Sequence, residues 1–72
     1  MSAFYEGLAE ILEIEPAEVG PDLSLTEHHW DSLSVVSTIA LVDECFNHLV
    51  EGASLARCER VSDIEALIEA AA

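Results

Sequence analysis

The sequence predicts an all-α fold, a small bundle of three main helices and one short helix. Apolar residues recur at helical spacing in three stretches, the longest of which, residues 32–46, contains neither Gly nor Pro. No stretch alternates apolar and polar residues as a half-buried strand does. With 72 residues there is room for one small core. We therefore expect a single domain over residues 1–72.

The first helix is expected to begin at Ser2, as its N-cap, and to run to about Ile14. Acidic residues lie on one side of this amphipathic pattern and apolar residues on the other, the latter being Phe4, Leu8, Ile11 and Leu12. Pro16 disfavours helical angles at Glu15, so the helix should stop there. A short helical turn from Pro16 to Val19 is compatible with the sequence.

Residues 22–30 form a polar loop, which Leu23 and Leu25 are expected to anchor on the core. Trp30, at the end of the loop, is expected to cover an edge of the core, because an aromatic body usually packs before it recognises a ligand. His28 and His29 are expected to lie exposed.

The second helix is predicted from Ser32 to about Asn47, with Asp31 as its N-cap, because the Asp31 carboxylate can accept from first-turn N–H groups. Its core residues are expected to be Val35, Ile39, Val42 and Phe46. Its exposed side is expected to carry Ser34, Ser37, Thr38 and Leu41, with acidic residues returning at Asp43 and Glu44.

A brief third helix is predicted from Ala53 to Cys58, with Leu55 and Cys58 facing inward. The last helix is predicted to start with a capping box, Ser62-Asp63-Ile64-Glu65, in which Ser62 and Glu65 satisfy first-turn N–H groups. Val61 would act as a hydrophobic staple. The inward residues of this helix are expected to be Ile64, Leu67 and Ile68.

The charge balance is strongly acidic, with 15 acidic and 2 basic side chains and a formal net charge of -13. Nucleic acids and anionic membranes are therefore not expected as partners, because both are bound largely through Lys and Arg. Basic protein surfaces are favoured. The two basic residues, Arg57 and Arg60, are expected to offset neighbouring acids such as Glu59 and Asp63.

Cys45 and Cys58 are expected to be reduced core thiols, because a lone pair in a helical pattern does not suit a disulfide framework. The N-terminus has no basic segment followed by an apolar one, and no apolar run approaches membrane-spanning length. A cytoplasmic protein, or an organelle protein without its transit segment, is the expectation. Met1 at the start and Ala70-Ala71-Ala72 at the end favour a stand-alone chain.

The hydroxyl of Ser32 is placed by this pattern at a helix N-terminus. Unpaired N–H groups and the positive end of the helix dipole favour a phosphate or another anion there. The residues alone take the prediction no further than an anion-favouring site.

Asp31-Ser32-Leu33 resembles the attachment motif of acyl carrier proteins. A long loop precedes it, and an apolar helix ending in Asp43-Glu44-Cys45-Phe46 follows it, as in that family. The resemblance spans nearly the whole chain and includes the acidic first helix, the short third helix and a last helix that opens with Val61-Ser62-Asp63-Ile64. It implies the small helical bundle of an acyl carrier.

The resemblance further implies that Ser32 receives a covalent 4'-phosphopantetheine arm from a phosphopantetheinyl transferase that uses coenzyme A. Asp31 and Leu33 would flank this attachment point. Acyl groups would be carried as thioesters on the arm and presented to a loading ligase and to acyl-processing enzymes. The chain would be a monomeric phosphoprotein without catalytic activity of its own.

The partner-binding face that the resemblance implies lies on the second helix and comprises Leu33, Val36, Ser37, Asp43 and Glu44. Carriers of fatty acid synthesis have a more acidic face there, so recognition here is expected to depend more on apolar contact. Trp30 directly before Asp31 resembles stand-alone carriers of specialised pathways more than the housekeeping carrier of fatty acid synthesis. The process that the resemblance implies is biosynthesis of fatty acid or polyketide type.

Four other readings remain open on the sequence alone. A peptidyl or aminoacyl carrier would share the fold and arm but carry another cargo, loaded by an aminoacyl ligase. An acidic interaction module would carry no prosthetic group. A hydrolase would need His28 or His29 to converge with Asp31 on Ser32. A zinc site would use Cys45, His48 and Cys58 with the loop histidines His28 and His29, although the spacing of Cys58 fits no familiar zinc module.

Overall fold

The computed structural model describes residues 2–28 and 30–71, and side chains for residues 3–28 and 30–70. Its elements are α1 (Ser2–Leu12), the 3-10 helix η1 (Pro16–Glu18), α2 (Ser32–Phe46), α3 (Gly52–Ala56) and α4 (Val61–Ala71). The described residues contain no strand, only one isolated bridge between Ser24 and Arg60. The predicted all-α fold of three main helices and a short one is confirmed.

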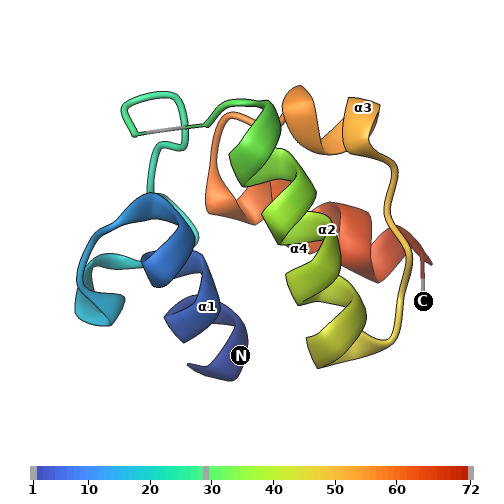
Figure 1. The fold of residues 1–72 in the computed structure, drawn as a ribbon, viewed down its shortest axis with the longest axis horizontal. Coiled ribbons are helices and arrows are strands. Elements are labelled where there is room, and N and C mark those ends of the chain that lie inside the picture. The colour runs from blue at the N-terminus through green and yellow to red at the C-terminus, as the bar shows by residue number, and fades with distance from the viewer. Residues whose placement is uncertain (1, 29, 72) are drawn as a thin grey trace.

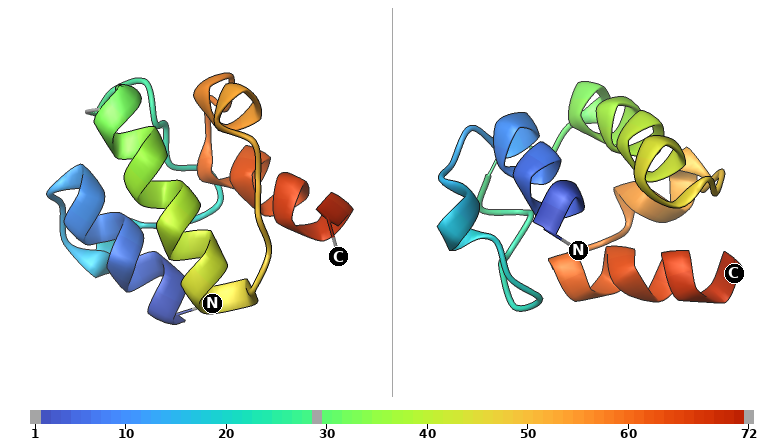
Figure 2. Two further views of the ribbon diagram at one scale, coloured as in Figure 1. Left: turned by 45° about the vertical axis from the view of Figure 1, so that its right-hand side comes forward. Right: turned by 90° about the horizontal axis from the view of Figure 1, so that it is seen from below.

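The helices α1 and α2 lie side by side and run in opposite directions, as both Figure 1 and Figure 2 show. The helix α4 crosses the pair, and the short α3 lies beside the first half of α2 (Figures 1 and 2). The Cα radius of gyration is 10.6 Å. The start of α2 is therefore bordered by α1 on one side and by α3 on the other.

The core is built from apolar residues of the four α-helices and of the loops between them. Its fully buried large side chains are Phe4, Leu8, Leu12, Leu25, Val42, Leu55, Val61 and Ile64. The ring of Phe4 meets that of Phe46 edge to face at a centroid distance of 5.5 Å, which joins α1 to the end of α2. The predicted anchor Leu25 is buried, and Leu23 packs partly buried against the core.

The helix α1 ends two residues before the predicted end at Ile14. Glu13 adopts a left-handed conformation, with φ 60°, and the N–H of Ile14 donates to Ala9 O at 2.9 Å. Together with the bond from the Glu13 N–H to Glu10 O at 3.3 Å, this bond forms a Schellman-type helix end. The helix therefore ends before it reaches Pro16. Its start at Ser2 agrees with the sequence, whereas the predicted capping by the Ser2 side chain lies outside the described side chains.

The exposed side predicted for α2 was partly wrong, because Ser34 and Thr38 are buried and Leu41 is half-buried. Thr38 Oγ1 donates to Ser34 O at 2.8 Å, so its hydroxyl is satisfied inside the helix. Leu41 packs against Gly7, where a Cβ atom would collide with its side chain. The lack of a side chain at Gly7 and the internally satisfied hydroxyl of Thr38 thus let α1 approach α2 closely.

The capping box predicted at Ser62 was also wrong. The helix α4 begins earlier, at Val61, and the N–H of Ser62 donates to Pro21 O at 2.9 Å. Asp63 performs the capping, since its Oδ2 accepts from the N–H groups of Glu59 at 3.0 Å and Arg60 at 3.1 Å.

The loop before α2 also pairs with the start of α4, because the N–H of Leu25 donates to Glu59 O and that of Val61 to Leu23 O. The bond from Ser62 to Pro21 O in the same pairing takes the N–H group that the predicted capping box had assigned to Glu65. The pairing between this loop and the start of α4 also fixes the position from which the chain continues to Trp30 and the start of α2.

Candidate functional site

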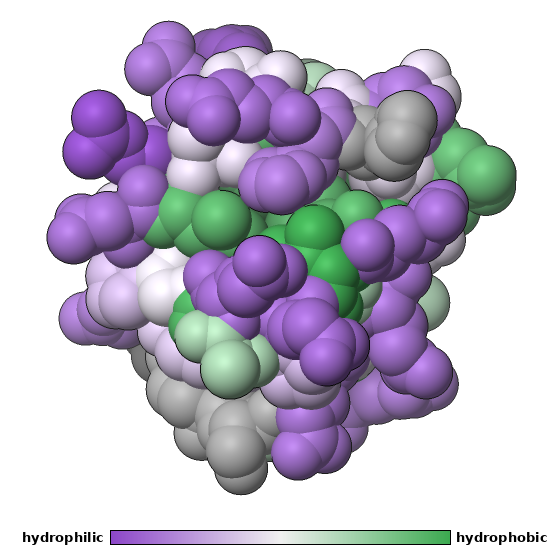
Figure 3. Space-filling model, turned by 90° about the vertical axis from the view of Figure 1, so that its left-hand side faces the viewer, coloured by the Kyte–Doolittle hydropathy of each residue, from purple (hydrophilic) through white to green (hydrophobic). Residues whose placement is uncertain are grey.

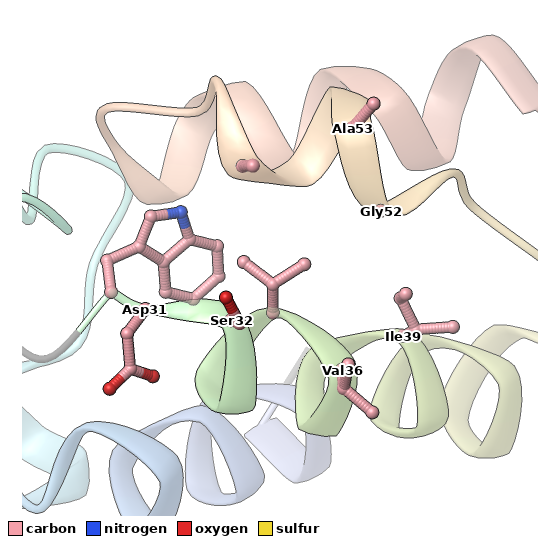
Figure 4. A pocket seen from close by; sticks show the side chains of 9 residues that line it. Asp31, Ser32, Val36, Ile39, Gly52 and Ala53 are labelled. Atoms are coloured by element: carbon pink, nitrogen blue, oxygen red, sulfur yellow. The ribbon is translucent and has the colours of Figure 1, made fainter.

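The start of α2 presents Asp31 and Ser32 in two different roles. Asp31 has extended backbone angles, and its Oδ1 accepts from the N–H of Ser34 at 3.0 Å, which confirms the predicted N-cap. Ser32 is the first residue of the helix and is exposed. In Figure 4 the Ser32 hydroxyl points toward the space between α2 and α3, whereas the Asp31 carboxylate points away from α3.

A groove of about 570 Å³ opens beside Ser32, between α2 and α3. Apart from Asp31 and Ser32 at its mouth, its lining consists of apolar residues and one glycine: Trp30, Val35, Val36, Ile39, Gly52, Ala53 and Ala56. Figure 4 shows Ile39 on α2 with Gly52 and Ala53 on α3 across from it, whereas Val36 lies at the outer edge of the groove with its side chain directed away from α3. The volume lies in the range of small-ligand sites.

Trp30 holds α3 next to the start of α2. Its Nε1 donates to Leu55 O at 3.0 Å, and its ring, partly buried, packs against the core. The predicted role as a loop anchor is confirmed, and the indole is in addition one wall of the groove.

The α3 wall of the groove was missed by sequence reasoning. The signal was the run of small residues Gly52, Ala53 and Ala56 in a short helix, which leaves space rather than filling it. Only the register of α3 against α2 reveals which side of these small residues faces the groove.

The exposed face of α2 carries two large apolar side chains, Leu33 at 75% exposure and Val36 at 61%. Asp43 and Glu44 are exposed farther along the helix, and Ser37 is half-buried. All five residues of the predicted partner-binding face thus lie on the helix that Ser32 begins. Figure 3 views the molecule from the side of α1, where hydrophilic side chains surround smaller apolar areas.

The two cysteines differ in their surroundings. Cys58 is buried as predicted, and burial, with the nearby Asp63 charge, raises the pKa of its thiol to about 11. Cys45 is exposed, so its prediction as a core thiol was wrong: it lies next to acidic residues on the outer side of α2 rather than on its apolar stripe. Both thiols are free.

The zinc alternative finds no support among the residues that the structure describes. Within residues 2–28 and 30–71, no group of three or more His, Cys, Asp or Glu is placed to hold a metal ion. His28 is half-buried rather than exposed, with its backbone N–H donating to Leu25 O at 3.1 Å. His29 lies outside the described residues.

The two arginines are exposed, as their predicted role beside acidic neighbours requires. The backbone N–H groups of Glu59 and Arg60 lower the pKa of the Asp63 carboxyl below its ordinary value of 3.8, and the Arg60 charge adds to this effect. Asp63 is therefore ionised where it caps α4.

The residues around Ser32 fit a phosphodiester-linked arm. An exposed hydroxyl at the start of a 15-residue helix places a phosphate against the positive end of the helix dipole. The neighbouring groove is open to this hydroxyl and offers an apolar surface to whatever the arm carries. Across the described helices, none combines the length and apolar character needed to cross a bilayer.

Comparison with known proteins identifies the family. Residues 2–68 match the model of the family described as "Phosphopantetheine attachment site". No curated protein and no solved structure matches the chain. The match covers nearly all of the chain and agrees with the helix order and with the exposed serine at the start of α2. The chain therefore belongs to the phosphopantetheine-attachment family, whose members are carrier domains modified covalently with 4'-phosphopantetheine.

Proposed function

We propose that this protein is an acyl carrier protein that holds acyl groups as thioesters on a 4'-phosphopantetheine arm attached to Ser32. The observation that carries this proposal is the exposed Ser32 hydroxyl at the mouth of an apolar groove. The family match over residues 2–68 supports treating residues 1–72 as one carrier domain. The arm, when attached, supplies the thiol that carries the cargo.

Attachment is a phosphoryl transfer in which Ser32 Oγ is the nucleophile. Its bond forms to the phosphorus that bears the pantetheine in coenzyme A, and the bond from that phosphorus to the bridging pyrophosphate oxygen breaks. Adenosine 3',5'-bisphosphate leaves, and a base of the transferase takes the serine proton. Asp31 is already engaged by the N–H of Ser34, so we assign it to positioning the start of α2 and Leu33 to contact with the transferase.

The groove favours acyl over aminoacyl cargo. Its walls contain no charged side chain beyond Asp31 at the mouth, whose carboxylate points away from α3. An aminoacyl ammonium placed between α2 and α3 would lose its hydration without gaining a partner, whereas an alkyl chain would gain apolar contact. A peptidyl or aminoacyl carrier is the second candidate.

The partner enzymes are proposed to read the face formed by Leu33, Val36, Ser37, Asp43 and Glu44. Its apolar residues lie nearest Ser32 and its acids farther along α2, which suits an enzyme with an apolar patch flanked by basic residues. The proposed partners are a phosphopantetheinyl transferase, a loading ligase and acyl-processing enzymes. We further propose that the carrier is a monomer and acts in the cytoplasm. Fatty acid and polyketide pathways both use such cargo.

The test is modification of the purified apo protein by coenzyme A and a broad-specificity phosphopantetheinyl transferase, followed by mass spectrometry. Wild type should gain the mass of one phosphopantetheinyl group, and Ser32→Ala should gain none. Ser62→Ala is the matched control, because Ser62 is also an exposed serine in the first turn of a helix but adjoins no such groove. It should be modified like wild type.

Two outcomes would reject the assignment. Equal mass gain by Ser32→Ala would place the arm elsewhere, and no gain by wild type would leave the acidic interaction module as the better description. Cleavage of simple esters that disappears in Ser32→Ala would instead support the hydrolase.

A further inference from the structure

Gly52 lies across the groove from α2, at the first position of α3. A Cβ atom at this position would lie 3.5 Å from Ile39 Cδ1 and 3.9 Å from Val35 Cγ1. Both are ordinary van der Waals distances. An added methyl group would therefore fit without displacing its neighbours, and it would occupy space that now belongs to the groove.

The positions of Ser32 and Ile39 give the groove a direction. They are seven residues apart on α2, which corresponds to about 10 Å along the helix axis. Between them the groove is lined on the α2 side by Val35 and Val36. A chain that enters near Ser32 and follows α2 therefore meets the pair formed by Gly52 and Ile39 away from the mouth.

We propose that Gly52, with Ile39 opposite, determines the length of the acyl chain that the groove can shelter. The proposal rests on the proposed carrier function and names its cargo more narrowly, as linear alkyl acyl groups of medium length. Each methylene that enters the groove leaves water and contacts the apolar walls. Once the chain reaches the Gly52–Ile39 pair, further carbons stay in solvent and gain nothing.

The substitution Gly52→Ala separates groove capacity from stability. Gly52 does not have a positive φ, and the new methyl makes no clash, so alanine is compatible with the backbone. Alanine should make the unfolded chain less flexible and should favour the helix, so the melting temperature should not fall. A loss of shelter for cargo would then be a loss of space.

Gly20→Ala is the matched control. A Cβ atom at Gly20 meets nothing within 4 Å, and its φ is likewise not positive. The control reproduces the glycine-to-alanine change outside the groove. The second variant, Ile39→Val, removes the Cδ1 atom that faces Gly52 and should deepen the groove.

The experiment loads the protein with a series of linear acyl-coenzyme A thioesters of increasing length through the transferase. Two quantities are measured for each chain: the rate at which hydroxylamine cleaves the thioester and the melting temperature of the acylated protein. In wild type, cleavage should slow several-fold and melting temperature should rise with chain length until both reach a plateau.

The variants should move this plateau in opposite directions. In Gly52→Ala it should come roughly one or two carbon atoms earlier, because an added methyl displaces about its own volume of cargo. Ile39→Val should delay it, and Gly20→Ala should follow wild type. The unacylated Gly52→Ala protein should melt at or above the wild-type temperature.

Failure of this inference differs from failure of the carrier assignment. A wild-type protein that gains no mass refutes the carrier function itself. A modified protein with no length dependence, or with the same plateau in wild type, Gly52→Ala and Ile39→Val, refutes the role of Gly52. If Gly52→Ala melts below wild type, Ile39→Val decides the question. A plateau reached at a longer acyl chain supports the role of the Gly52–Ile39 pair, and an unchanged plateau refutes it.

Discussion

Val36 and Leu49 are both apolar and largely exposed, but only Val36 adjoins Ser32 in the groove. A charge at Val36 would have to be desolvated against any apolar partner patch. We expect Val36→Asp to lower the kcat/KM of the transferase about fivefold or more, as loss of a central contact worth more than about 1 kcal/mol implies. Because Val36 is exposed, the circular dichroism spectrum should not change.

Leu49→Asp is the control for Val36→Asp. Leu49 is 81% exposed and lies in the segment between α2 and α3, outside the proposed partner-binding face. The Leu49→Asp variant introduces the same charge but outside that face. The kcat/KM of the transferase with this variant should therefore remain near the wild-type value. Equal losses in both variants would show that the added charge, and not the Val36 contact, slows the transferase.

At the residue scale, the sequence predicted those roles that depend on near neighbours in the chain. Asp31 as N-cap and Ser32 at the helix start follow from local hydrogen bonding. The burial of Ser34 and Thr38 was not predictable in this way, because a polar residue usually faces solvent. It depends on where α1 lies against α2 and on a hydroxyl bond made inside the helix.

At the element scale, α1 and α4 are joined by a bond between residues 60 positions apart: Tyr5 Oη donates to Glu65 Oε2 at 2.6 Å. This bond, together with desolvation and the Glu65 charge, raises the pKa of Tyr5 from 10.0 to about 12. Both folded and unfolded chains keep the tyrosine proton below pH 10. The contribution of the bond to stability is therefore full there, and it should be lost as pH rises from 10 to 12.

The measurement is a titration of the phenolate absorbance, which reports Tyr5 alone because the chain has one tyrosine. Glu65→Ala should return the titration toward pH 10, and Tyr5→Phe should reduce the free energy of unfolding by about 1 kcal/mol below pH 10. Wild-type Tyr5 titrating at its ordinary pKa would show that the bond between α1 and α4 does not persist in solution.

The helix ends show why element boundaries were harder to predict than the elements. Periodicity identified every helix, but the start of α4 depends on the loop that precedes α2. Pairing with Pro21 and Leu23 takes the N–H groups of Ser62 and Val61, so Asp63 caps the helix in place of the local box. Likewise α3 was predicted as a helix, whereas its function as a groove wall depends on the Trp30 bond.

At the scale of the whole molecule, composition predicted the acidic character but not its energetic consequence. Folding brings a formal charge of -13 within a radius of gyration of 10.6 Å, whereas an unfolded chain of this length has a radius of about 26 Å. Self-repulsion therefore opposes the folded state more than the unfolded one. The native structure must offset this repulsion through its apolar core.

Salt should consequently stabilise this protein. The Debye length falls from about 30 Å at 0.01 M salt to about 3 Å at 1 M, which is well below the radius of the fold. We expect the melting temperature to rise between these NaCl concentrations by about 4–8 °C for each kcal/mol of repulsion removed. Differential scanning calorimetry measures this rise directly.

A double variant distinguishes repulsion from a general effect of salt. Glu6→Gln and Glu10→Gln together remove two exposed charges of α1 without touching the core or the groove. The variant should melt above wild type at low salt, and its melting temperature should rise less on adding NaCl, because less repulsion is left to screen. Parallel salt curves for the two proteins would mean that salt acts on hydration of apolar surface rather than on charge. The acidic surface would then cost the fold little, and its significance would lie with the basic partners alone.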